Sequence, residues 1–117
     1  MIARTWSARA TPDGAAAYQA FFAGTLLPEL RTLAGFAGGY LLSRQDGETV
    51  ELTTHTFWES VAAIHAFAGD DITRSVVEPE ARAVLLDIDP TVTHRDVLID
   101  ARPDPRARHP RRVRPRH

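Results

Sequence analysis

The chain has 117 residues, of which 44% are hydrophobic and 25% are charged. These proportions are typical of a soluble protein with a single domain, and no apolar run approaches the length of a membrane span. Cysteine is absent, which excludes a disulfide scaffold, a thiol nucleophile and a metal held by cysteine. The first six residues contain no basic stretch followed by an apolar block, so we expect no secretory signal and a cytoplasmic location.

The net charge of −1 hides an uneven distribution of charge along the chain. Residues 1–100 contain seven Arg and fourteen acidic residues (−7), whereas residues 101–117 contain seven Arg and one Asp (+6). We therefore predict a domain over 1–100 and a disordered Arg/Pro-rich tail over 101–117. A basic tail can bind nucleic acid, but this one has no aromatic residue on which bases would stack. We favour a solvated tail.

The first part of the chain predicts a strand followed by a long, interrupted helix. Residues 2–9 alternate between two faces, as a strand requires. Thr11 followed by Pro12 is typical of a helix start, because Thr caps the helix and Pro suits its first turn. Pro28 has no N–H to donate, so we expect a kink or a short break near residues 25–27.

The middle of the chain predicts a β-hairpin. Gly35 is expected to end the preceding helix in a left-handed conformation, and a strand is expected over 36–44. The Asp-Gly pair within 45–48 favours a hairpin turn. Residues 49–58 then form the clearest strand, in which Val50, Leu52, Thr54, Thr56 and Trp58 share one face.

The last part of the domain predicts helical segments and a closing strand. Ser60 is placed to cap a helix over 61–68 that stops at Gly69. A short helical piece could begin at Asp70–Asp71, and another could run from Glu78–Pro79 to Leu86. Asp89–Pro90 then turns the chain into a strand over 91–99.

The predicted order of strand, helix, strand, strand, helix, strand is that of the ferredoxin-like split βαβ fold, an α+β fold with a four-stranded antiparallel sheet. Two helices can cover only one face of such a sheet, and the other face also needs cover. A second copy of the chain, packed sheet against sheet, would provide it. We therefore expect a homodimer.

Three segments resemble the antibiotic biosynthesis monooxygenase family. They are Met1–Trp6, the passage from Thr56 through Trp58 to Gly69, and Asp89–His94. The resemblance covers roughly residues 1–100 and implies a dimeric α+β barrel. It also implies an oxidoreductase of polyketide tailoring that uses dioxygen, without metal or flavin, on a small aromatic substrate.

The chain departs from the family in ways that keep other functions open. The quinone-forming members are described with an Asn near the reacting oxygen, and this chain contains no Asn. Phe67 and Val77 stand where the haem-degrading branch has a Trp and an iron-binding His, so we expect no haem. The missing Asn favours a cyclase or isomerase on the same scaffold as an alternative. A non-enzymatic dimer that binds a small molecule is the other alternative.

Two residues are the candidates for catalysis. His94 lies mid-strand among apolar and Thr neighbours, where a neutral imidazole could accept a phenol proton near pH 7. Its alternative role is a structural hydrogen bond in the sheet or at a dimer interface. Trp58 is expected to hold the substrate ring, although a large aromatic side chain in a strand is more often part of the core. His55 should face away from Trp58, toward a partner subunit.

Five further residues are candidates for substrate binding. Trp6, Tyr18, Phe22 and Phe67 would line a pocket, with core packing as the simpler alternative. If the face of the sheet that carries Arg4 is the covered one, its guanidinium needs a carboxylate partner or an anionic ligand. His65 is expected at the surface. No histidine pair has metal-ligand spacing, so we expect no metal site.

Overall fold

Strand β1 (Ile2–Ala10) lies at the centre of the sheet in the computed structural model, which describes residues 1–103. It pairs antiparallel with β3 (Thr49–Trp58) on one side and with two short strands, β4 (Asp87–Ile88) and β5 (Thr93–Asp96), on the other. Strand β2 (Phe36–Asp46) pairs with β3 and forms the far edge. This order confirms the α+β fold class and is consistent with the predicted ferredoxin-like arrangement. Residues 104–117 of the predicted tail lie outside the described residues.

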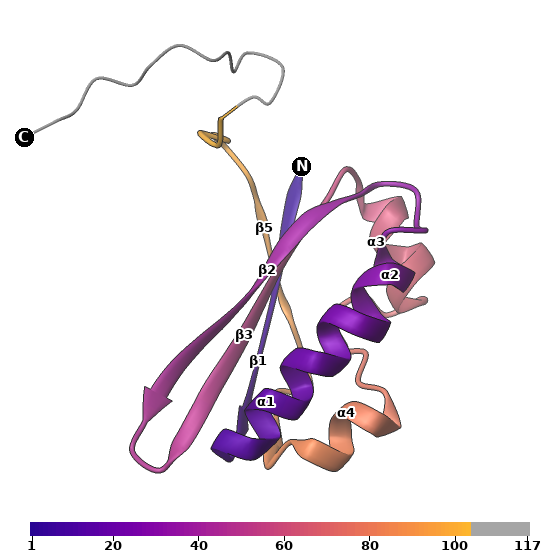
Figure 1. The fold of residues 1–117 in the computed structure, drawn as a ribbon. Helices are drawn as coiled ribbons and strands as arrows, with labels where there is room; N and C mark the ends of the chain where they lie inside the picture. Colours follow the sequence, from indigo (N-terminus) through magenta and orange to yellow (C-terminus); the bar gives the residue numbers. More distant parts are fainter. Residues whose placement is uncertain (104–117) are drawn as a thin grey trace, which may run out of the picture.

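The helices lie together on one face of the sheet (Figure 1). Helix α1 (Pro12–Phe21) begins where Thr11 Oγ1 accepts a hydrogen bond from the Gly14 N–H, and α3 (Val61–Ala68) begins where Ser60 Oγ accepts one from Ala63. Both predicted caps are therefore confirmed. Helix α4 (Pro79–Val84) ends two residues earlier than predicted. No helix in the described part of the chain is long and apolar enough to span a membrane.

The expected break near Pro28 is a change of helix type rather than an interruption. After α1 the chain continues as a π-helical turn, η1 (Phe22–Leu26), and then as α2 (Leu27–Leu30). The Leu27 N–H donates to the Phe22 carbonyl, five residues back. Pro28 has no N–H for the carbonyl four residues earlier, so a widened turn accommodates it without ending the helix.

The predicted last strand, 91–99, and the helical piece at Asp70–Asp71 differ from the structure. The strand position is filled by β4 and β5, with Pro90 between them. Proline cannot donate to the ladder, and the Val92 N–H instead donates to the Thr73 carbonyl. The Asp71 carboxylate accepts from the Thr73 N–H, which makes a local turn in place of a helix.

The two faces of the sheet differ as the alternation in β3 predicts. Val50, Leu52, Thr54, Thr56 and Trp58 are buried under the helices, whereas the residues between them point to the opposite face. The buried apolar residues form two clusters. One is Trp6, Ala8, Ala10, Tyr18, Phe22, Val50, Leu52 and Ala81, and the other is Leu30, Trp58, Ala63 and Ile64.

Candidate functional site

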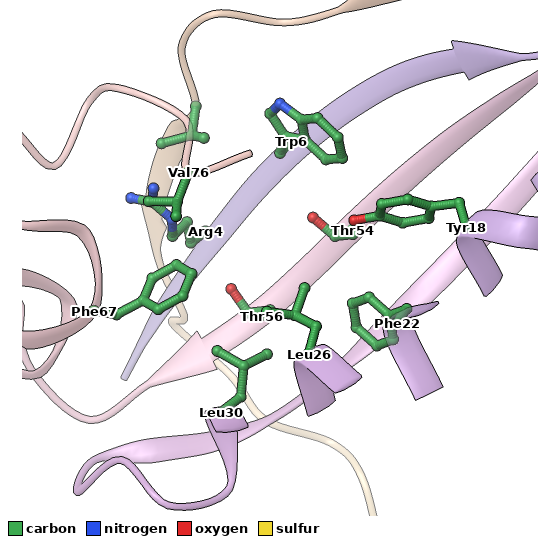
Figure 2. Close-up of a pocket in the computed structure, with 11 residues that line it drawn as sticks. Arg4, Trp6, Tyr18, Phe22, Leu26, Leu30, Thr54, Thr56, Phe67 and Val76 are labelled. Carbon is green, nitrogen blue, oxygen red and sulfur yellow. The ribbon is translucent and has the colours of Figure 1, made fainter. Parts of the chain in front are cut away.

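A cavity lies between the two apolar clusters, under the helices and above the middle of β1 and β3 (Figure 2). Its volume is about 50 Å³, within a concavity of about 440 Å³ that includes the open mouth. The polar side chains of this buried face, Arg4, Thr54 and Thr56, all line it. The core is therefore interrupted at the point where the cavity lies.

All five predicted substrate-binding residues line this cavity. Arg4 and Trp6 come from β1, Tyr18 from α1, Phe22 from η1 and Phe67 from α3. The structure therefore brings together residues that are up to 63 positions apart in the sequence. Tyr18 and Trp6 are also in contact, with ring centroids 6.1 Å apart. The aromatic side chains thus serve the core and the cavity wall together.

Six further lining residues were not predicted as site residues. The threonines were identifiable in principle, because they are the only polar residues on the covered face of β3. Val76 lies in a segment without regular periodicity, and Val92 was predicted as part of the strand over 91–99 without being assigned to a site. These six are Leu26, Leu30, Thr54, Thr56, Val76 and Val92.

Arg4 is the most unusual residue of the site, because it is a charged side chain with only 4% of its surface exposed. Its Nη1 donates to the Ile72 carbonyl at 2.6 Å, and its Nη2 donates to the Arg74 carbonyl at 3.1 Å. The guanidinium also lies over the Phe67 ring, with Cζ 5.8 Å from the centroid. No ion pair among residues 1–103 includes Arg4. Its positive charge is thus stabilised by neutral groups, the two backbone carbonyls and the Phe67 ring among them.

His94 lies directly opposite Arg4 in the β1–β5 pair, outside the cavity lining. Its Nε2 is 3.0 Å from Arg4 Nη1. A guanidinium can only donate, so Nε2 accepts and the ring proton is assigned to Nδ1. Burial, together with the charge of Arg4, lowers the pKa of His94 from its ordinary value of 6.5. The imidazole is therefore neutral near pH 7, but its lone pair is occupied by Arg4.

Trp58 forms the wall behind the cavity rather than its lining. It has no exposed surface and stacks on Phe67 with ring centroids 5.5 Å apart. Its Nε1 donates to Thr56 Oγ1 at 2.9 Å, deep in the core. Trp58 therefore holds Phe67 and Thr56 in position, and these two residues face the cavity.

The hydroxyl groups of Tyr18 and Thr54 face the cavity (Figure 2). The exposed fractions of the two residues are only 3% and 8%, and no fully buried side-chain oxygen or nitrogen within residues 1–103 lacks a hydrogen-bond partner. Burial, with the negative charge of Glu78, raises the pKa of Tyr18 to about 12. Tyr18 therefore keeps its proton at neutral pH and remains a hydrogen-bond donor.

A second concavity, the groove between α1 and β2, is larger but chemically poorer. Its volume is about 580 Å³, and no titratable side chain lines it. Phe22 lines both the groove and the cavity, so its ring separates the two spaces. Both spaces combine apolar walls with a few polar groups, which in the groove are Gln19, Ser43 and Gln45. Only the cavity also contains a charged side chain, that of Arg4.

The other histidines lie away from the cavity. His55 is on the opposite face of the sheet, where its Nδ1 lies 2.9 Å from Thr5 Oγ1. His65 is exposed and lies 2.8 Å from the Gly69 carbonyl at the end of α3. Within the described residues, no group of three or more His, Asp or Glu side chains is placed to hold a metal ion.

The comparisons with known proteins concern the fold. No family model and no curated protein matches the chain. The structure of NE2512, a protein of unknown function from Nitrosomonas europaea, aligns with a TM-score of 0.55 and 20% identity over 88% of this chain and 94% of that one. Rv0793 from Mycobacterium tuberculosis aligns with a TM-score of 0.53 and 21% identity over 86% and 97%. Likeness at this level establishes the fold alone, so the activity has to be argued from the site.

Proposed function

We propose that the chain is a cofactor-independent monooxygenase that oxidises a small aromatic, polyketide-like molecule in the cavity between the sheet and the helices. The observation that carries the proposal is the lining itself. Four aromatic side chains from β1, α1, η1 and α3 converge on one space that also contains a buried cation. Aromatic walls with few polar groups suit a flat, electron-rich ring.

The chemistry needs little from the protein beyond binding and orientation. An anthrone that has lost a proton transfers electrons directly to dioxygen. One oxygen atom becomes the new carbonyl of the quinone, and the other leaves as water with the two hydrogens of the oxidised carbon. The substrate supplies all the electrons, so the balance needs no further reductant. The residues of the cavity hold the ring and exclude water from the intermediate.

The positive charge of Arg4 supports this chemistry, because a nearby cation favours the ionised form of a phenol or enol. His94 contributes by accepting a hydrogen bond from Arg4 and so fixing the guanidinium. In this role His94 is a positioning residue, and the proton of the substrate leaves to solvent through the open mouth. In this proposal the neutral phenol of Tyr18, which lines the same cavity, donates a hydrogen bond to the bound substrate.

Oxygen uptake tests the proposal. The protein, freed of metals by a chelator, is given anthrone, and uptake is compared with the spontaneous rate. We expect uptake above that rate and a product with one added oxygen atom. Phe67→Leu removes a ring from the cavity and should raise KM several-fold. Phe21→Leu removes a similarly half-buried ring that does not line it and should leave KM unchanged.

The outcome that contradicts monooxygenase activity is the absence of uptake above the spontaneous rate. Conversion of the same compounds without oxygen would instead support the cyclase or isomerase alternative. Saturable binding without any conversion would support the binding protein.

We also propose a homodimer formed through the uncovered face of the sheet. Tyr40 and Leu42 on this face have 48% and 44% of their surfaces exposed. Phe57 lies beside Tyr40 with ring centroids 6.1 Å apart. Apolar side chains gathered on one sheet face favour packing against a second copy. Light scattering should give twice the mass of the chain, and the mass of a single chain would contradict this proposal.

A further inference from the structure

The cavity is lined by hydrogen-bond donors and by one positive charge, that of Arg4, which no acidic side chain among the described residues balances. None of its lining residues is acidic. The guanidinium of Arg4 is 4% exposed, and no carboxylate among residues 1–103 lies within ion-pair distance. A buried charge without a counter-charge is costly to the fold. Such a cost is usual at functional sites, where a ligand completes the arrangement.

The donors of Arg4 are only partly used by the protein. A guanidinium has five N–H groups. Three hydrogen bonds among the described residues use it, namely those to the Ile72 carbonyl, the Arg74 carbonyl and His94 Nε2. All three come from Nη1 and Nη2, which leaves the Nε–H and one Nη2–H. These two neighbouring donors match the paired oxygens of a carboxylate.

Two hydroxyl groups extend this set of donors. Tyr18 and Thr54 line the same cavity, and their hydroxyls face it. The raised pKa of Tyr18, about 12, keeps its proton in place. A neutral ligand would satisfy hydroxyl groups equally well, because they both donate and accept. Only an anion also balances the charge of Arg4.

We propose that the cavity selects aromatic monoanions, with a carboxylate or an ionised hydroxyl held by Arg4, while the hydroxyls of Tyr18 and Thr54 face the bound molecule from the other side of the cavity. This inference rests on the proposed function, since it names the ligand class of the same cavity. The volume of about 50 Å³ suits a charged group of a few atoms, because a cavity that holds benzene measures about 150 Å³. The ring then occupies the wider concavity of about 440 Å³, which Phe67 and Val76 also line. Arg4 is the residue that determines specificity.

Calorimetric titration with a matched pair of ligands tests this inference. 1-Naphthoate and 1-naphthamide have nearly the same shape, but only the first is charged. We expect naphthoate to bind at least tenfold more tightly at low salt. Arg4→Met should abolish the difference, whereas Arg9→Met should preserve it. Arg9 lies in the same strand but faces the opposite side and pairs with Asp46.

Two further variants cover the case in which Arg4→Met fails to fold. Tyr18→Phe and Thr54→Val each remove one hydroxyl and leave the contacts of Arg4 intact. Each should weaken the binding of naphthoate and naphthamide by similar factors and keep the preference for naphthoate, because hydroxyl groups also bond a neutral amide and only Arg4 carries the charge. 1-Naphthol separates the two sources of the charge. If an ionised hydroxyl is also accepted, the absorbance of bound naphthol should show a pKa below that of free naphthol.

Equal affinity for the acid and the amide, or binding of neither, would overturn the inference, as would a preference for naphthoate that survives in Arg4→Met. These outcomes are independent of oxygen chemistry. A preference for naphthoate without oxygen uptake from any substrate would leave the anion site standing and remove only the monooxygenase activity. Oxygen uptake with neutral anthrones, without a preference for naphthoate, would support the monooxygenase activity and remove the anion site.

Discussion

Two stretches of the same sheet face carry opposite chemistry. Toward the end of β1, Ala8 faces Leu52 across the strand pair, and both are buried in an apolar cluster. Four residues earlier, Arg4 faces Thr56, and both are equally buried. Both pairs are buried on the same face, and Thr56 accepts the indole N–H of Trp58, but burial alone does not require a charged residue at position 4. The difference favours the proposal that the middle of this face binds a ligand, whereas the apolar stretch serves packing.

The comparison predicts that substitutions in the apolar clusters act on stability. Trp58→Ala should have the largest effect, because Trp58 has no exposed surface and contacts Phe36 and Phe67. We expect its free energy of unfolding to fall by about 3–5 kcal/mol, measured by urea denaturation. A loss below about 1 kcal/mol would mean that the cluster is not the packed core described above.

Phe22 stands at the boundary between the core and the two open spaces. Phe22→Ala should lower the free energy of unfolding by about 3 kcal/mol and join the cavity to the groove along α1. Ligands with three fused rings should then bind more tightly relative to naphthoate than in the wild type. Titration with anthracene-9-carboxylate measures this ratio. An unchanged ratio would show that Phe22 does not separate the spaces.

Thr54 and Thr56, the two buried threonines of β3, allow the same substitution to be compared at a residue of the core and at a residue of the cavity. Thr56 accepts the indole N–H of Trp58, so Thr56→Val leaves a buried donor without a partner and should cost about 1–3 kcal/mol. Thr54→Val removes a hydroxyl that faces only the cavity. Its stability should change by less than about 0.5 kcal/mol, while naphthoate binding weakens. The reverse pattern would contradict the distinction between core and site.

The Arg4–His94 pair predicts a smaller effect, which depends on pH. The pKa of His94 is lowered in the folded chain, so the unfolded chain binds this proton more readily. Neutral His94 therefore contributes fully to the free energy of unfolding above pH 6.5. This contribution is lost as the pH falls through the pKa that His94 has in the folded chain. Between pH 7 and pH 5, the wild type should lose more unfolding free energy than His94→Gln. Parallel profiles would contradict the neutral, buried imidazole.

Much of the fold could be predicted from local pattern. The alternation in β3 identified the covered face, and the caps at Thr11 and Ser60 identified two helix starts, because each depends on residues close in sequence. The predicted strand over 91–99 was wrong in extent. Its course depends on distant contacts, such as the hydrogen bond from the Trp6 indole to the Asp89 carbonyl at 2.8 Å.

The site was predictable in its composition but not in its geometry. Five lining residues were identified because aromatic and charged side chains in amphipathic elements must face either a core or a pocket. The partners of Arg4 were not predictable. Two are backbone carbonyls of a segment without periodicity, at Ile72 and Arg74, and the third depends on the register that places His94 opposite Arg4.

The most direct test of the central claim observes the N–H groups of the site in solution. In nitrogen-15 spectra, the Nε–H of Arg4 and the two indole N–H groups give separate resonances. On addition of 1-naphthoate, we expect the Arg4 and Trp6 resonances to shift, since both residues line the cavity. The Trp58 resonance should stay in place, because its N–H is bonded to Thr56 within the core, and 1-naphthamide at the same concentration should shift the Arg4 resonance less, because it binds more weakly. An Arg4 resonance that stays unmoved at saturating naphthoate would contradict the claim that this polar stretch is the ligand site.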